Sequence, residues 1–325
     1  MKPITLLLLI TTNMIWAMNP LMGKWVLADF QPLQVAWIRY FSAAIFFWMT
    51  LLICRFSVRF RNWMGPLFPF FKTRKTAFQV IAMGLITFCL GPLLAFIGLS
   101  RTQAIDNALV VALEPLVTVL LAFMILREPL RKVDAIGFAI ALFGFALLSG
   151  IVLKTHEATS SQSSVLGNIV IALSLLGEGF FSVFSRILIR KFNAVAIFAT
   201  SLAIGALALT IVMFMTEGLP SLQSFTLQSA LAALWIGPLG TGVCYFIWLW
   251  LLRHATVSSI AASVLIQPVV GALGGYFFLH EILSSLQALG AFLIILAVFT
   301  PLFVQMFSDT LRARVRERAA QKSQI

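Results

Sequence analysis

Two carboxylates, Glu114 and Glu178, stand inside long apolar segments. A charged carboxylate at the centre of a lipid bilayer costs at least ~2.5 kcal/mol, so each should accept a proton or pair with a cation. Ser174, Ser182 and Ser185 fall on the helical face of Glu178. We predict that Glu178 binds protons or a cationic substrate. The alternative is a buried glutamate with a structural role, which accepts hydrogen bonds from these serines or pairs with an arginine.

Prolines mark two further polar positions in the apolar segments. Pro115 directly follows Glu114, and Pro268 directly follows Gln267. Proline cannot donate the helical hydrogen bond four residues back, so Pro115 should free the carbonyl of Val111. We predict helix kinks at both prolines, with Glu114 and Gln267 as substrate- or proton-binding groups beside them. Kinks of this kind are common in membrane helices, so a structural origin stays open.

Basic and aromatic side chains complete the candidate set. Arg39 and Lys24 either bind a substrate carboxylate, neutralise the glutamates or extend to the lipid interface. Trp16, Tyr245 and Trp248 are candidates to line a binding cavity, although aromatic residues also form belts at membrane surfaces.

The residue patterns typical of several other functions do not occur in the sequence. Cys54, Cys89 and Cys244 are far apart and show no C-x-x-C spacing, so we expect no metal or redox site. The P-loop, H-E-x-x-H and G-x-S-x-G motifs do not occur, so an ATP-driven pump or a hydrolytic enzyme is not expected. We expect no cofactor.

Composition identifies the elements that must position these groups. The chain has 325 residues, 61% hydrophobic and 10% charged, with a mean hydropathy of +1.01. A soluble globule could not bury so many apolar side chains, whereas a membrane helix needs about 20 of them. We therefore predict an all-α polytopic membrane protein with ten transmembrane helices. Their expected ranges are 3–23, about 40–54, 76–100, 107–126, 135–153, 158–189, 192–216, 229–252, 255–279 and 282–308.

Basic residues predict the orientation of these helices. All but four of the 23 Lys and Arg lie on one side when the N-terminus is placed inside; the four are Lys24, Arg39, Arg101 and Lys154. Cytoplasmic loops are enriched in Lys and Arg, so both termini should be cytoplasmic. This arrangement explains the net charge of +12 without a nucleic-acid partner, and makes residues 307–325 a basic cytoplasmic tail.

The chain also contains an internal repeat. Glu114-Pro115 matches Gln267-Pro268 at an offset of 153 residues, and Glu128 matches Glu281 at the same offset. We expect a structural role at helix ends for Glu128 and Glu281. The predicted halves are 4–152 and 166–306, joined by an external linker at 153–165. Five helices per half is an odd number, so the second half enters the membrane in the opposite sense, with a site near the midplane.

These features together resemble a known family. Trp16 followed by Lys24, Pro32 before Arg39, and a proline 13 residues ahead of a glutamate in both halves are similar to two EamA domains of the drug/metabolite transporter superfamily. The resemblance implies a transporter of small metabolites, often an exporter, without a bound cofactor. Glu178 stands eight residues before Arg186, which also resembles the first helix of small multidrug resistance transporters, where a glutamate exchanges protons for cationic substrate.

The functional prediction is a secondary transporter that works by alternating access. We expect export of amino acids or cationic, amphiphilic compounds, driven by proton exchange. An uncoupled facilitator or uptake carrier is the main alternative, and a membrane receptor or scaffold is a remote one because the loops are short. The expected partners are a small-molecule substrate, membrane lipid and protons. A monomer should hold a complete pathway, a dimer stays open, and the resemblance suggests a bacterial inner membrane.

Overall fold

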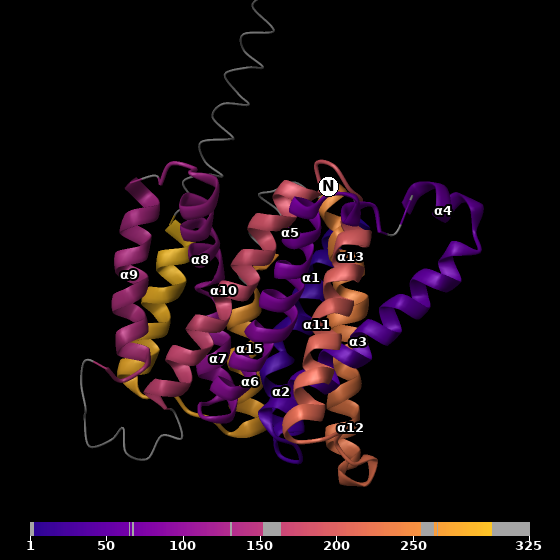
Figure 1. The fold of residues 1–325 in the computed structure, drawn as a ribbon. Helices are drawn as coiled ribbons and strands as arrows, with labels where there is room; N and C mark the ends of the chain where they lie inside the picture. The colour runs from indigo at the N-terminus through magenta and orange to yellow at the C-terminus, as the bar shows by residue number, and fades with distance from the viewer. Residues whose placement is uncertain are drawn as a thin grey trace, which may run out of the picture.

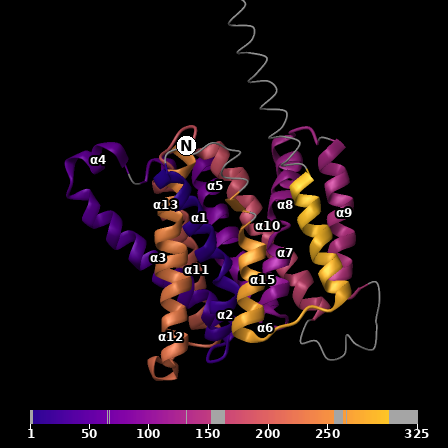
Figure 2. The ribbon, with the colours of Figure 1, turned by 180° about the vertical axis from the view of Figure 1, so that it is seen from behind.

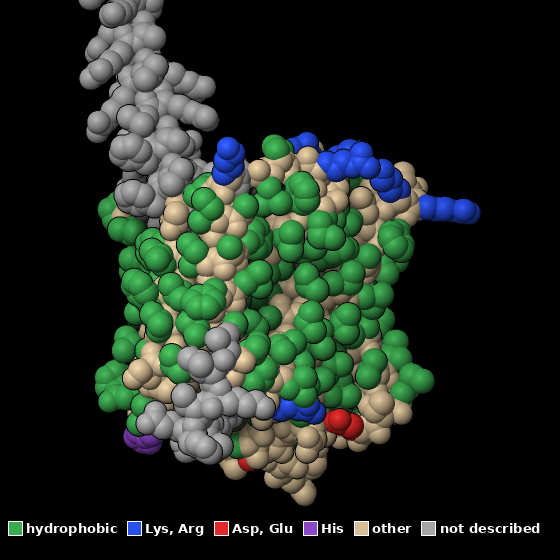
Figure 3. Space-filling model, turned by 90° about the vertical axis from the view of Figure 1, so that its left-hand side faces the viewer, with side chains coloured by type: hydrophobic (Ala, Val, Ile, Leu, Met, Phe, Trp, Pro, Cys, Tyr) green, Lys and Arg blue, Asp and Glu red, His purple; other side chains and the backbone are tan. Residues whose placement is uncertain are grey.

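A computed structural model describes residues 3–64, 66, 68–130, 132–151, 164–254, 263–264 and 266–300. The described residues form helices and connecting turns, without a β-strand. The helices run side by side as a bundle (Figure 1), and the view from behind shows the same arrangement (Figure 2). Hydrophobic side chains cover the middle of the surface, and Lys and Arg gather mainly at one end (Figure 3).

Seven helices within the described residues are long and apolar enough to cross a membrane. The first span, Pro3–Leu27, contains α1 (Pro3–Ala17) and α2 (Asn19–Leu27), and the second, Pro32–Arg55, is α3. The third span, Arg74–Ser100, contains α5 (Arg74–Leu85) and α6 (Gly91–Ser100). The fourth span, Ala104–Leu126, contains α7 (Ala104–Val111) and α8 (Glu114–Leu121). The other three are Val165–Leu188, which is α10; Ala194–Thr216, which is α11; and Leu227–Leu251, which contains α12 (Leu227–Leu234) and most of α13 (Cys244–His254).

The described residues also contain shorter helices, among them α4 (Val58–Met64) and three that overlap predicted spans. These three are α9 (Lys132–Leu148), α15 (Ile266–Leu279) and the helix Ser285–Thr300. The start of the predicted ninth span, the end of the tenth, and nearly all of the linker and the whole basic tail lie outside the described residues. The prediction of a helical membrane protein is therefore confirmed at the level of seven spans, and the full set of ten stays a prediction.

The second span begins earlier than its apolar run. Helix α3 starts at Pro32, where proline suits the first helical turn and Gln31 and Gln34 form a capping box. Arg39 consequently lies about two turns inside the helix. Capping also defines other starts: the Asn193 side chain accepts from the Val195 N–H before α11.

Contacts in the loops also join sequence-distant helices. At the end of the first span, the Asp29 carboxylate accepts hydrogen bonds from the N–H and hydroxyl of Thr226, at 3.1 and 2.8 Å. Hydrogen bonds from Ser229 and from Thr226 lower the pKa of Asp29 below its ordinary value of 3.8. The turn before α3 is thereby tied to the start of α12.

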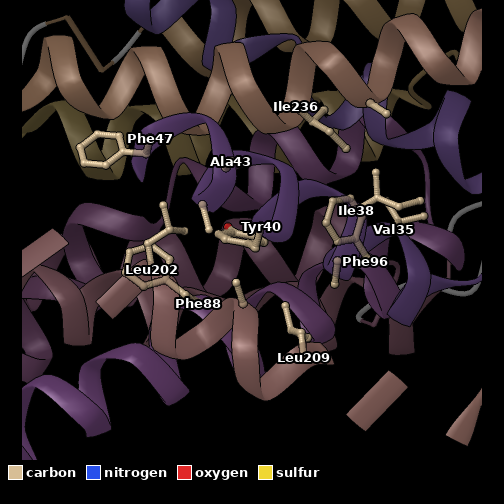
Figure 4. Packing of buried hydrophobic residues seen from close by; sticks show 14 of the residues in the cluster. Val35, Ile38, Tyr40, Ala43, Phe47, Phe88, Phe96, Leu202, Leu209 and Ile236 are labelled. Carbon is tan, nitrogen blue, oxygen red and sulfur yellow. The ribbon is translucent and has the colours of Figure 1, made fainter. Parts of the chain in front are cut away.

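The largest cluster of buried apolar side chains lies around α3. Tyr40 of α3 packs against Phe88 of the third span, and Phe47 of α3 packs against Phe198 of α11. Leu202 and Leu209 of α11 belong to the same cluster (Figure 4). The Phe47 and Phe198 rings meet edge to face with centroids 4.8 Å apart. This packing holds α3 against the bundle at the level of Arg39.

Close glycine contacts bring α6 against α10. A Cβ on Gly177 would lie only 3.2 Å from the Gly91 Cα, so a side chain there would require the two helices to shift apart slightly. The Thr87 hydroxyl also donates to the Gly177 carbonyl at 2.9 Å. Both contacts are adjacent to Glu178, and they hold its backbone against the third span.

The internal repeat is visible in two matched turns. Arg127 and His280 are 153 residues apart, and both have left-handed backbone with φ of 56° and 55°. The next residue in each case, Glu128 or Glu281, donates its N–H to the carbonyl six residues back, at 3.4 and 3.2 Å. The offset read from the sequence therefore corresponds to one local conformation that occurs twice.

Two π-helical segments form a further pair. They are Ile86–Leu90, directly before Gly91-Pro92, and Trp235–Val243, which contains Gly237-Pro238. Proline lacks an N–H and disturbs the helical ladder before it, which explains the wider turns. The repeated Gly-Pro pair could have indicated these two segments from the sequence, but it was not among the features used for the predictions.

Candidate functional site

One cavity of about 260 Å³ lies among the helices. All the residues expected to bind substrate or protons line it, except Lys24. They come from both halves of the chain: Trp16, Arg39, Glu114, Glu178, Ser182, Tyr245, Trp248 and Gln267. Residues up to 251 positions apart in the sequence thus meet at one site, which follows from the packing of the two halves and not from proximity along the chain.

Glu178 projects from the middle of α10 among polar partners. The Tyr245 hydroxyl donates to its Oε2 at 3.3 Å, and Arg39 is near enough to act on it electrostatically. Arg39 itself donates from Nε to the Thr241 hydroxyl at 3.1 Å, and its guanidinium carbon lies 5.1 Å from the centre of the Tyr40 ring. Glu178 therefore has a nearby positive charge and a hydrogen-bond donor.

Glu114 lies where the fourth span is interrupted. Helix α7 ends at Val111, a short turn follows, and α8 begins with Glu114 and Pro115. The prediction of a kink at Pro115 thus corresponds to a break between two helices. Among the described residues, the Glu114 carboxylate has no hydrogen-bond donor, and the charge that acts on it is that of Glu178.

Aromatic rings form one wall of the cavity. The Trp16 ring lies 5.4 Å from Tyr245 and 5.0 Å from Trp248, between ring centres. Trp16 donates from Nε1 to the Gly240 carbonyl at 2.7 Å, and the Tyr245 ring stacks on Phe198. These contacts limit ring motion and present flat apolar surfaces to the cavity.

Amide side chains contribute a neutral polar region. Gln267, in the first turn of α15, donates from Nε2 to the Asn13 Oδ1 at 2.8 Å. Asn13 in turn donates to the Ser263 hydroxyl at 3.0 Å. Pro268 lies in the same turn of α15, but residue 265, directly before α15, is outside the described residues, so the kink predicted at Pro268 stays a prediction.

Several cavity residues were not among the sequence-based candidates. They are chiefly the polar side chains of Asn19, Tyr40, Thr87 and Asn107. A polar residue inside an apolar run was the available signal, but by itself it does not distinguish a cavity from a helix contact. Ser174 and Ser182 of the predicted serine face line the cavity, whereas Ser185 lies beyond it and donates to the Met83 sulfur at 3.8 Å.

The remaining charged candidates lie at the ends of the bundle. Arg186 forms two hydrogen bonds of 3.0 Å to the carboxylate of Glu128. Glu281 accepts hydrogen bonds of 2.8 Å from the N–H groups of Ala104 and Ile105, at the start of α7. These contacts confirm the helix-end roles predicted for the two glutamates. Lys24 interacts electrostatically with Glu281 outside the cavity.

No cluster of three or more His, Cys, Asp or Glu side chains suited to a metal ion exists within the part of the chain described by the structure. The described residues that line the cavity include one guanidinium, that of Arg39, and two carboxyl groups, those of Glu114 and Glu178. Their chemistry is reversible binding of protons and of small polar or charged molecules.

Comparison with known sequences places these features in a family. The sequence profile described as the EamA-like transporter family matches residues 3–150 and again residues 165–302. The two matches cover most of the chain and leave a gap at the segment between α9 and α10.

Individual relatives are distant in sequence and match between about two thirds and nearly all of the chain. The uncharacterized transporter YoaV of Bacillus subtilis is 23% identical over 302 residues, which covers 91% of this chain and 95% of the relative. The protein PecM of Dickeya dadantii is 24% identical and covers 65% of this chain and 69% of its own length. One crystal structure superposes with a TM-score of 0.61 at 17% identity, over 94% of this chain and 97% of that one. It shows that the fold is shared.

Proposed function

Since the chain belongs to the EamA-like transporter family, we propose that it moves a small organic metabolite through the central cavity as a secondary transporter. Family membership already makes it an integral membrane transporter and not an enzyme. The observation that most supports the cavity as the transport site is its composition. Polar and aromatic side chains from both family matches line it, inside a bundle whose outer surface is apolar.

The proposed topology has ten spans in two inverted halves, with both termini in the cytoplasm. The gathering of Lys and Arg at one end of the bundle supports this orientation (Figure 3). The matched turns at Arg127 and His280 support a repeat. The connection from α8 to α9 lies at the top of Figure 1 and the connection after α15 at the bottom, which supports opposite orientations of the two halves. Alternating access would then rock the halves around the cavity. The broken fourth span and the π-helical segments at the two Gly-Pro pairs supply positions where helices can bend.

We further propose export in exchange for protons, in the inner membrane of a bacterium. Two carboxylates in one apolar cavity can hold a proton in one state and release it in another. Amino acids and cationic, amphiphilic compounds are the substrate classes that this site suits. The alternative is an uncoupled facilitator, in which both glutamates only bind substrate. The Arg39 charge near Glu178 favours this alternative, because it gives that carboxylate a structural partner.

Reconstituted liposomes separate these functions. The purified protein would be incorporated into liposomes, and the uptake of radiolabelled phenylalanine or phenethylamine would be measured with and without a pH difference across the membrane. For one-for-one exchange, a difference of one pH unit should drive about ten-fold accumulation. Equal uptake with and without the gradient would indicate the facilitator. Absence of transport for a wide panel of amines, amino acids and acids would contradict the transport site.

A reporter test addresses topology. An accessibility tag inserted between Lys72 and Thr73 should be labelled from the cytoplasm, whereas a tag between Leu219 and Pro220 should be labelled from outside. Matched untagged protein controls for background. Labelling of both tags from the same side would refute the ten-span arrangement.

A further inference from the structure

The charges that line the cavity do not balance. Among the described residues, its lining contains one cationic side chain, Arg39, and two carboxylates, Glu114 and Glu178. With both carboxylates ionised the lining therefore has one net negative charge. An uncompensated charge in an apolar, water-poor space is costly, so the site in this state favours one added positive charge.

The two carboxylates differ in how far the protein itself satisfies them. Glu178 has the Tyr245 hydroxyl at 3.3 Å and the Arg39 charge nearby. Glu114 has no donor among the described residues, and its main electrostatic neighbour is the like charge of Glu178. The position that lacks a positive partner is therefore the one beside the Glu114 carboxylate.

The aromatic wall suits the same kind of ligand. Trp16 and Trp248 lie 5.0 Å apart between ring centres and both line the cavity. Tryptophan faces attract cations through their π electrons, and flat apolar groups stack on them. A volume of about 260 Å³ is slightly below the usual range of ligand pockets, about 300–1,000 Å³, which limits the ligand to roughly one ring with a short side chain.

An anionic group finds no comparable site. The guanidinium of Arg39 already donates to Thr241, lies over the Tyr40 ring and faces the charge of Glu178. A substrate carboxylate would have to compete with these partners and would also meet the charge of Glu114. The cavity thus discriminates against acids and, more weakly, against zwitterions.

We infer that the substrate is an organic monocation, a compact amine with a flat apolar group, and that its ammonium pairs with Glu114. The inference rests on the proposed function for the site and narrows its substrate class. Binding of the amine, or of one proton at Glu114, brings the lining to the same net charge. Amine and proton therefore compete for one carboxylate, and each bound amine displaces one proton when Glu114 starts protonated.

A matched ligand series tests the substrate class. Phenethylamine, phenylalanine and 3-phenylpropionate share a ring and differ in charge, as a cation, a zwitterion and an anion. Calorimetric titration of the detergent-purified wild type should show binding of the amine, at least ten-fold weaker binding of the amino acid and none of the acid. Tighter binding of the amino acid or the acid than of the amine would overturn the inference, and so would no binding of the amine.

Charge-balanced variants test the position of the cation. Glu114→Gln should weaken amine binding at least ten-fold, while Glu128→Gln, outside the cavity, should leave it unchanged. The double variant Arg39→Gln/Glu178→Gln keeps Glu114 and the net charge of −1, so it should retain amine binding. The double variant Arg39→Gln/Glu114→Gln has the same net charge but should bind weakly. Equal binding by the two double variants would overturn the assignment to Glu114.

Two separate outcomes distinguish this inference from the proposed function. Amine binding without transport in liposomes would refute the transport function and keep the ligand class. Transport of the acid or the amino acid in preference to the amine would keep the transport function and refute the ligand class. For each variant, thermal unfolding of the purified protein verifies that binding is measured on a folded molecule.

Discussion

The turn between α15 and the helix Ser285–Thr300 should contribute strongly to stability through one side chain, Glu281. Its carboxylate is buried, at 9% exposed for the residue, and accepts two hydrogen bonds of 2.8 Å from the first N–H groups of α7. Helix N-termini leave these N–H groups without helical partners, and the helix dipole favours a negative charge there. Replacing Glu281 with Ala removes both bonds and leaves two donors to be hydrated.

The size of the effect follows from these contacts. A hydrogen bond to a charged group contributes about 1.5–3 kcal/mol, so two lost bonds correspond to about 3–6 kcal/mol. Water that reaches the freed N–H groups would reduce the loss to about 3 kcal/mol. We expect the variant to unfold at a clearly lower temperature in detergent, and its amine or substrate binding to be affected only through folding, since Glu281 is outside the cavity.

The repeat supplies a matched control for this experiment. Glu128 occupies the same position in the same left-handed turn, but its ion pair with Arg186 is exposed, with the two side chains 51% and 59% accessible. Exposed ion pairs contribute about 0–1 kcal/mol, so Glu128→Ala should shift the unfolding midpoint far less than Glu281→Ala. Equal shifts in the two variants would refute the argument that burial and the α7 N–H groups make the difference.

Three further predictions use the carboxylates and prolines. Glu114→Gln removes the carboxylate for which amine and proton compete, so proton-driven accumulation in liposomes should disappear in a protein that still folds; normal accumulation would exclude proton exchange at this residue. Replacing Pro115 and Pro268 together with Ala should straighten their helices and slow transport at unchanged expression, and unchanged rates would leave the prolines a packing role. Hydrogen bonds from Ser229 and neighbouring groups at the start of α12 lower the pKa of Asp29, so its stabilisation is complete above its ordinary value of 3.8 and is lost as the pH falls through the lower folded value. Asp29→Asn should therefore lower the unfolding midpoint at neutral pH, with a difference from wild type that shrinks in acid, and a pH-independent difference would contradict this reasoning.

The apolar composition and the repeat could be read from the sequence because both are one-dimensional patterns. Long uncharged segments require a membrane, since neither water nor a globular core of this size accommodates them. The 153-residue offset between Glu128 and Glu281 is likewise a matter of spacing, and the matched turns confirm it. Glu114 and Glu178 could be singled out for the same reason: a carboxylate in an apolar helix is costly wherever that helix packs.

Tertiary structure decided which of these groups meet. Helical periodicity assigns a residue to a face, but the neighbour of that face depends on how helices pack, which residues such as Gly91 and Gly177 control by their small size. Lys24 and Arg39 are both basic residues of the first two spans, yet Arg39 lines the cavity and Lys24 faces Glu281 beyond it. The unequal surroundings of Glu114 and Glu178 arise in the same way, because Tyr245 and Arg39 reach Glu178 from other helices, and contacts between helices leave no mark in the spacing of a single one.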